Sequence, residues 1–245
     1  MHTPSNIFLY FDWAYAIRPY EDNMKYTDWG LTDYNDAWQR QEHIFSETIR
    51  RKLENLPTEN HLIFCEHPHV YTLGKSGSDQ NLLLNMIQLQ AKNAIFVHTN
   101  RGGDITYHGP GQLVGYPIFD LESFHIGLKK YIFLIEESII QLLQEYGISA
   151  ERLDGASGVW LDAHSKKARK ICAIGVRSSR YVTMHGFALN VNTDLNYFNY
   201  INPCGLVDKG VTSLQKELGK EIDMEELKTR LKVKIEALFI EQQST

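Results

Sequence analysis

Short strand-like runs fill most of this chain and are separated by Gly, Pro and Asn, with three helical runs between and around them. That mixture predicts an α/β (α+β) fold with a mixed β-sheet flanked by helices. The helical runs are residues 33–56, 128–147 and 221–242. We expect Pro57 to end the first helix, Gly147 to end the second and Asp223 to cap the start of the third. The strand-like runs are HLIFCEH, VYTLGK, AIFVHTN, DITYHG, QLVGYPIFDL, SGVWLDA, RKICAIGVRS and VTMHGFALNV.

Composition places the chain among ordinary globular proteins. It has 245 residues, of which 43% are hydrophobic and 22% charged, enough to build a core without disulfides or metals. No repeat, low-complexity linker or Pro/Gly/Ser-rich boundary divides it, so we expect a single domain. Residues 1–28 are aromatic and irregular, with one strand expected near residues 7–11, and they form an N-terminal extension whose role the sequence leaves open.

Charge and hydropathy exclude several classes of function. The formal net charge of −5 argues against a nucleic-acid partner. No apolar window is long enough to span a bilayer. The run IFLYFDWAYAI contains Asp12 and has no Lys or Arg before it, so it is not read as a signal peptide and a cytoplasmic location is expected. Cys65, Cys172 and Cys204 form no CxxC pair, which disfavours disulfides and a cysteine zinc site.

The densest unusual stretch is RGGDITYHGPGQLVGYP, residues 101–117, with five glycines and two prolines. Such a density allows close approach of the backbone to a ligand or to another backbone segment, although a pair of tight turns would also explain it. Arg101, Tyr107 and His108 supply polar side chains there. The stretch is neither a P-loop nor a GxGxxG motif that opens a helix. Nearby, His67 and His69 form an HxH pair, but Pro68 and the lack of a third ligand disfavour a metal.

Lys170 and Cys204 are the reactive residue types in unusual settings. Lys170 enters the apolar run RKICAIGV, where a period of two places it on the same face as Cys172. It can reach solvent at the strand end, or it can lower the pKa of a nearby thiol. Cys204 lies between Pro203 and Gly205 in INPCGL, a turn context in which packing and catalysis remain equally open.

Several long motifs in the same order resemble one family, the octanoyltransferases of lipoate biosynthesis, also called lipoyl(octanoyl) transferases. They are RGGDITYHGPGQLVGYPIFDL, GVW, RKICAIGVR, HGFALNVNTDL, INPCGL and GVTSL. The segments GLTDYNDAW and EHPHVYTLGK are similar to the same family. The resemblance implies that residues 29–245 form an octanoyltransferase catalytic domain with the fold of the biotin and lipoate protein ligases. It also implies a monomer.

The resemblance further implies the reaction and its partners. An octanoyl group would pass from octanoyl-acyl carrier protein to a lysine of a lipoyl domain, as the first step of endogenous protein lipoylation. The acceptors would be 2-oxoacid dehydrogenase complexes and the glycine cleavage H protein. Because the donor is already a thioester, no ATP, cofactor or metal is expected.

The family pattern also assigns residues. Cys204 would carry the acyl group and Lys170 would transfer protons, with His185 in a supporting role. Cys172 departs from the small residue expected beside Lys170, which adds a second thiol. The residues expected to line the acyl site are Arg101, Gly102, Gly103, Asp104, Ile105, Thr106, Tyr107, His108, Ala173, Ile174, Gly175, Gly186, Phe187 and Ala188.

Two alternatives stay open on the sequence alone. The first is an ATP-dependent lipoate or biotin ligase of the same fold, and the second is a noncatalytic protein that binds acyl groups or lipoyl domains. A further hypothesis concerns Lys166, Lys167 and Arg169, a basic run in an acidic chain. It predicts electrostatic steering of an acidic partner, although such a run is also typical of a solvated hairpin.

Overall fold

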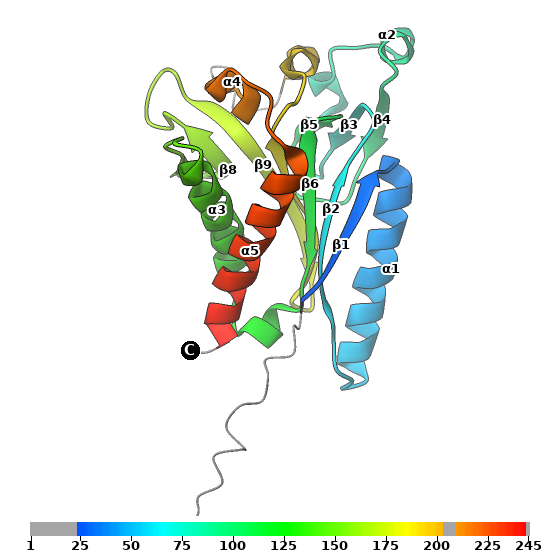
Figure 1. Cartoon of the computed structure of the whole chain (residues 1–245). Helices are drawn as coiled ribbons and strands as arrows, with labels where there is room; N and C mark the ends of the chain where they lie inside the picture. Colours follow the sequence, from blue (N-terminus) through cyan, green and yellow to red (C-terminus); the bar gives the residue numbers. More distant parts are fainter. Residues whose placement is uncertain (1–23, 203–208, 244–245) are drawn as a thin grey trace, which may run out of the picture.

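A computed structural model describes residues 24–202 and 209–243 and shows one long sheet between two helical layers (Figure 1). The sheet has the order β1-β2-β6-β10-β9-β8-β7, and β11 pairs with β9 outside this path. The β1–β2 and β9–β11 pairs are parallel and the others are antiparallel, so the sheet is mixed as predicted. Its strands are β1 Met24–Leu31, β2 Asn60–Glu66, β6 Gln112–Ile118, β7 Glu151–Leu153, β8 Ala156–Leu161, β9 Arg169–Ser179, β10 Val182–Asn190 and β11 Gly210–Val211.

A second, three-stranded sheet stands at one end of the long sheet, at the top of Figure 1. Its order is β4-β3-β5, and it carries its own apolar cluster. The eight strand-like runs of the sequence are all strands, but the sequence did not predict that they divide between two sheets. The elements of this end are β3 Val70–Leu73, β4 Ile95–His98, β5 Ile105–His108, the 3-10 helices η2 Asp79–Asn81 and η4 Leu195–Tyr200, and the helix α2 Met86–Ala91.

The three predicted long helices are present, and their caps explain where they begin and end. Helix α1 spans Tyr34–Leu53, and the Asp33 side chain accepts hydrogen bonds from the backbone N–H groups of Asn35 and Asp36. Gly147, just after α3 Leu128–Glu145, has a φ of +74° that suits a glycine. Helix α5 Met224–Gln243 begins at Asp223, which accepts from Glu225 and Glu226 as predicted. The short helices η3 Leu121–Phe124 and α4 Leu214–Leu218 complete the described chain.

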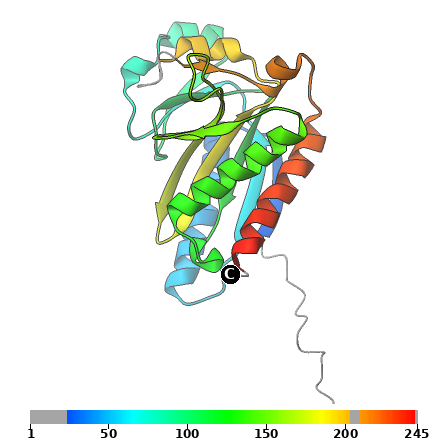
Figure 2. The same cartoon turned by 90° about the vertical axis from the view of Figure 1, so that its left-hand side faces the viewer.

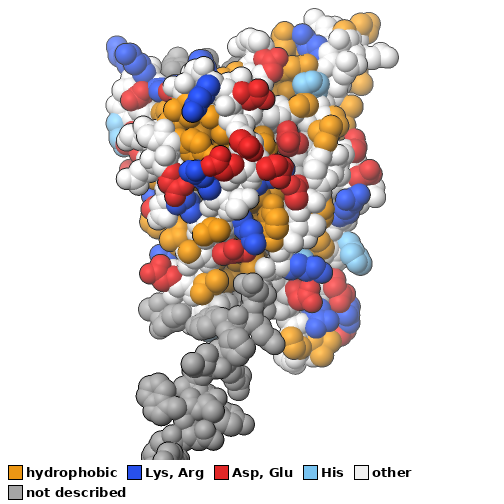
Figure 3. Space-filling view, viewed as in Figure 1, with side chains coloured by type: hydrophobic (Ala, Val, Ile, Leu, Met, Phe, Trp, Pro, Cys, Tyr) orange, Lys and Arg blue, Asp and Glu red, His pale blue; other side chains and the backbone are white. Residues whose placement is uncertain are grey.

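Helices α3 and α5 lie side by side over one face of the long sheet (Figure 2). Their apolar residues, among them Leu134, Ile139, Leu231 and Phe239, join the largest core cluster. Helix α1 covers the opposite face with a smaller cluster that includes Phe45. Charges of both signs are interspersed on the outer surface in Figure 3. The long sheet is therefore flanked by helices on both faces, as the sequence predicted.

Strand β1 crosses the boundary at residue 28 that the sequence suggested. It runs parallel to β2 from Met24, and Lys228 of α5 donates a hydrogen bond of 2.7 Å to Asp28. Residues 24–28 are thus part of the sheet. The strand expected near residues 7–11 lies outside the described residues.

Candidate functional site

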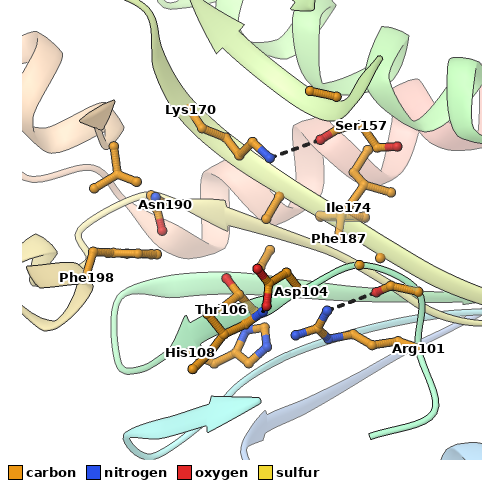
Figure 4. A pocket seen from close by; sticks show the side chains of 18 of the residues that line it. Arg101, Asp104, Thr106, His108, Ser157, Lys170, Ile174, Phe187, Asn190 and Phe198 are labelled. Carbon is orange, nitrogen blue, oxygen red and sulfur yellow. Dashed lines mark hydrogen bonds between the residues drawn. The ribbon is translucent and has the colours of Figure 1, made fainter. Parts of the chain in front are cut away.

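A pocket of about 980 Å³ opens where the small sheet meets β9 and β10 of the long sheet (Figure 4). That volume lies at the upper end of the range for small-molecule sites, roughly 300–1,000 Å³. Of the fourteen residues expected to line the acyl site, thirteen line this pocket, together with Lys170 and His185. Tyr107 does not. Its ring stacks on Tyr197, and its hydroxyl hydrogen-bonds to His69 Nδ1 at 2.7 Å on the far side of β5.

The glycines of the RGG segment allow the two sheets to meet. The Gly102 N–H donates a hydrogen bond of 2.9 Å to the Val176 carbonyl of β9. A Cβ at Gly175 would lie 3.0 Å from Gly102 O, and one at Gly186 would lie 2.1 Å from Gly115 O. Side chains at these two positions would force the backbones apart. Within the glycine-rich stretch itself, a Cβ at Gly102 would lie 3.2 Å from Val176 O and one at Gly111 would lie 2.5 Å from Asn192 O, so its close approach to other backbone segments is confirmed.

Arg101 is buried at the inner end of this segment, with 7% of its surface exposed. Its guanidinium donates to the Thr72 carbonyl at 2.6 Å, the Thr72 hydroxyl at 2.9 Å and the Gly102 carbonyl at 3.0 Å. Burial lowers the pKa of Arg101. The side chain therefore ties β3 to the glycine segment and places a positive charge beside the pocket.

Two histidines of the pocket are neutral. His108 Nδ1 lies 2.8 Å from Gln112 Oε1, and burial holds the pKa of His108 well below its usual value. His185 Nε2 lies 2.6 Å from Asn100 Oδ1, and burial, with Arg101 and Arg177 nearby, lowers the pKa of His185 to about 3. Neither imidazole carries a proton to donate as an imidazolium near pH 7.

Gln112 and Asn190 also belong to the site, although neither was predicted from the sequence. Gln112 Nε2 donates to Asn190 Oδ1 at 2.9 Å, and Asn190 Nδ2 donates to the Thr212 carbonyl at 3.0 Å. This chain of amides links His108 to the segment that follows residue 209. A polar residue in an otherwise apolar strand was the available signal.

Lys170 reaches the pocket from β9. Its ammonium donates a hydrogen bond of 3.2 Å to the Ser157 carbonyl and lies 4.6 Å from the centre of the Trp160 ring. Burial lowers the pKa of Lys170, and Cys172 and Glu136 act in the opposite direction. A lysine with a lowered pKa exchanges protons more readily near neutral pH than an exposed one.

The interpretation that Lys170 and Cys172 share a face is wrong. Ile171 and Cys172 both lie in the core beneath α3 and α5, while Lys170 and Ala173 line the pocket. The cause is a β-bulge, because Val159 pairs with Cys172 and Trp160 with Lys170, which leaves one extra residue on β9. Cys172 is therefore a fully buried thiol, and burial raises its pKa.

The proposed nucleophile, Cys204, lies outside the described residues. The described residues on either side of that gap, Asn202 and Lys209, both line the pocket. Gly210 and Val211 then pair with Arg169 and Lys170. Within the described parts of the chain, no group of three or more His, Cys, Asp or Glu could hold a metal ion.

The basic run beside Lys170 is not uniform. Arg169 forms ion pairs with Asp162 and with Glu217, the latter at 2.7 Å. Lys166 and Lys167 are exposed on the preceding turn. Of the three residues in the steering hypothesis, the two lysines therefore offer their charge to solvent.

Comparison with known proteins identifies relatives of this amino-acid sequence. A family model described as lipoyl protein ligase A/B catalytic domain matches residues 33–236. An octanoyltransferase of Bacteroides thetaiotaomicron is 59% identical over 215 residues, covering 88% of this chain and 95% of its own. One from Bacteroides fragilis is 60% identical over 205 residues, covering 84% and 93%.

Solved structures agree on the fold. A bipartite lipoate protein ligase from Thermoplasma acidophilum superposes with a TM-score of 0.61, covering 91% of this chain and 93% of its own, at 15% sequence identity. At that identity the likeness supports the fold alone.

Among the described residues, no helix is both long and apolar enough to cross a membrane.

Proposed function

Because this chain belongs to the octanoyltransferase family, and is therefore an acyltransferase, we propose that Cys204 carries the octanoyl group and that Lys170 moves the protons of the transfer. The observation that carries the proposal is the position of Lys170. Its ammonium lies among the residues that line the pocket, and burial lowers its pKa. Asn202 and Lys209, which flank the segment containing Cys204, line the same pocket.

The first half of the reaction is a thioester exchange. The Cys204 thiolate attacks the carbonyl carbon of octanoyl-acyl carrier protein and forms a new C–S bond. The bond to the carrier sulfur breaks, and that sulfur takes a proton from the Lys170 ammonium. One thioester replaces another at nearly equal free energy, so no ATP is required.

The second half forms an amide. The amine of a lipoyl-domain lysine attacks the Cys204 thioester, the C–N bond forms and the C–S bond breaks. Neutral Lys170 accepts the proton that the amine loses, which returns the enzyme to its starting charge. The acceptors are the lipoyl domains of 2-oxoacid dehydrogenase complexes and the glycine cleavage H protein.

The octanoyl chain is proposed to lie along β9 and β10. The small residues Ala173, Gly175, Gly186 and Ala188 leave room there, and Ile174 and Phe187 add apolar surface. Arg101 and His108 close the other side of the pocket, as Figure 4 shows. The two described cysteines, Cys65 and Cys172, are buried thiols whose pKa burial raises, which supports Cys204 as the nucleophile.

Intact-mass analysis after mixing with octanoyl-acyl carrier protein tests this function. We expect one added octanoyl group, which is lost in Cys204→Ser and retained in Cys172→Ala. Lys170→Ala should lower the transfer rate by about 10²–10⁴-fold with the fold intact. Near-normal turnover of Lys170→Ala would remove this lysine from the mechanism. Octanoic acid with ATP, in place of the carrier thioester, should give no product; product would identify a ligase.

A further inference from the structure

The peptide group between Ser157 and Gly158 joins a buried carboxylate to the Lys170 ammonium. Its carbonyl accepts the hydrogen bond from Lys170 Nζ at 3.2 Å, seen in Figure 4. Its N–H donates a hydrogen bond of 2.9 Å to Glu136 Oε1 of helix α3. Carboxylate, amide and ammonium thus form one continuous chain of hydrogen bonds.

The backbone can hold this arrangement because residue 158 is a glycine. Gly158 has a φ of +119°, which other residues rarely adopt. A Cβ at this position would lie 2.4 Å from the Cys172 carbonyl oxygen and 3.5 Å from Lys170 Cε. The peptide consequently approaches β9 more closely than any side chain would allow.

Glu136 is fixed independently of the peptide. Only about a tenth of its side chain is exposed, and Oε2 accepts from Arg152 Nε at 3.0 Å. Arg152 also pairs with Glu137 at 2.7 Å and lies 3.9 Å from the centre of the Phe133 ring. The other carboxylate oxygen of Glu136 therefore points at Gly158 from a rigid support.

Linked hydrogen bonds of this kind strengthen one another. A carboxylate that accepts from the N–H draws electron density toward the carbonyl oxygen, which then accepts more strongly from the ammonium. The charge of Glu136 also favours the charged form of Lys170 directly, against the effect of burial. Among the described residues, the Cys172 thiol acts on Lys170 electrostatically from the core side of β9, and the Lys209 ammonium lies 5.9 Å from the centre of the shared Trp160 ring.

We infer that Glu136 is a positioning residue for the transfer reaction, because it orients the Lys170 ammonium through the Ser157–Gly158 peptide and stabilises its charge. The inference rests on the proposed role of Lys170. In this role the Glu136 carboxylate acts through Lys170 and touches neither the substrate nor the nucleophile.

The test compares Glu136→Gln with Glu137→Gln. Both variants remove one negative charge from the same turn of α3 and one acidic partner from Arg152, but only Glu136 contacts Gly158. The glutamine oxygen at 136 can still accept from the Gly158 N–H, while the glutamine NH2 group then faces Arg152 Nε and loses that hydrogen bond. The readout is competitive acetylation of Lys170 across a pH series, followed by mass spectrometry, with Lys25 as the exposed internal reference.

We expect the labelling midpoint of Lys170 to move to lower pH in Glu136→Gln and to stay in place in Glu137→Gln. The alkaline limb of the pH profile of kcat/KM for octanoyl transfer should also move to lower pH in Glu136→Gln. On that limb kcat/KM should fall about tenfold, which is equivalent in free energy to one charge-assisted hydrogen bond. An unchanged midpoint, or an equal shift in both variants, would overturn the inference. Glu136→Asp, which keeps the charge but withdraws the carboxylate from the Gly158 N–H, should also lower the midpoint and serves where Glu136→Gln does not fold.

The labelling needs no substrate, so it separates this inference from the proposed function. A shifted midpoint with normal turnover in Lys170→Ala would support the Glu136–Lys170 link and reject the proton-transfer role. An unshifted midpoint with an inactive Lys170→Ala would reject the link and leave the proposed function standing.

Discussion

Cys172 lies in the core beneath α3 and α5, while Lys170, two residues earlier on the same strand, lines the pocket. The bulge between them separates the second thiol from the candidate catalytic lysine. It also decides what substitution of each residue should do.

We expect Cys172→Ala to lower stability and leave the reaction intact. Removing one buried sulfur creates a small cavity, which should cost about 1–2 kcal/mol in the free energy of unfolding. The single octanoyl label should remain. Urea denaturation and intact mass measure the two effects, and loss of the label in a variant that is still folded would show that Cys172 takes part in the chemistry.

Stability should fall on the acid side of neutrality. Burial lowers the pKa of His185 to about 3 and that of His67 to about 4, from 6.5 for an ordinary histidine. At a pH between the folded pKa of each histidine and 6.5, the unfolded chain binds a proton that the folded chain does not. The free energy of unfolding therefore decreases as the pH falls below about 6.5. Each such histidine contributes roughly 1.4 kcal/mol per pH unit within its window.

The measurement is the urea midpoint between pH 7.5 and pH 4.5. As the pH falls, the urea midpoint of His185→Asn should decrease less steeply than that of the unsubstituted protein. His164→Asn, at an exposed position, should keep the original slope. Parallel curves for all three proteins would contradict this prediction.

Gly186→Ala should damage the sheet at the pocket. The added methyl would meet Gly115 O at 2.1 Å and Pro117 Cδ at 2.7 Å, so β10 and β6 would have to separate. A loss of about 1–3 kcal/mol or more in the free energy of unfolding is expected. The control is Gly127→Ala, where a Cβ meets nothing within 4 Å, and comparable losses in the two variants would be inconsistent with the close approach.

Lys166 and Lys167 should accelerate encounter with an acidic carrier protein. Their double substitution by Gln should lower kcat/KM several-fold at low salt, with little effect at high salt, because screening removes long-range attraction. Arg169 is left unchanged because its ion pairs hold β9 to Asp162 and Glu217. A control that replaces Lys25 of β1 and Lys232 of α5 removes the same charge from elements other than β9 and its preceding turn, and an equal loss there would argue against steering.

The sequence predicted the long helices and the buried strands because their patterns are strong. Strand β1 was missed because its run MKYTDWGL is mostly half-exposed and carries two charges, as edge strands do. The bulge in β9 was missed because a period of two holds only while the register is unbroken. Strand alternation turns Tyr107 away from Thr106 and His108, but it does so for Ile105 as well, which lines the pocket, so alternation alone does not decide the lining.

Nearly all the residues predicted to line the acyl site do line the pocket, whereas the residues around Lys170 were not predicted. Glu136, Ser157 and Trp160 come from a helix and from a neighbouring strand, and no spacing in the sequence relates them to Lys170. Their relation depends on how α3 packs against β8, which is a property of the folded core. The family motifs therefore pointed to the candidate reacting groups, whereas the groups that hold Lys170 are found only in the folded structure.

The short strand β11 has a consequence for the entropy of the reaction. The Thr212 N–H donates a hydrogen bond of 3.0 Å to the Lys170 carbonyl, and Asn190 holds the Thr212 carbonyl in turn. Two parts of the chain that are far apart in sequence are thereby fixed side by side before any substrate arrives. The loss of freedom needed to bring them together occurs once, during folding, and does not recur at each turnover.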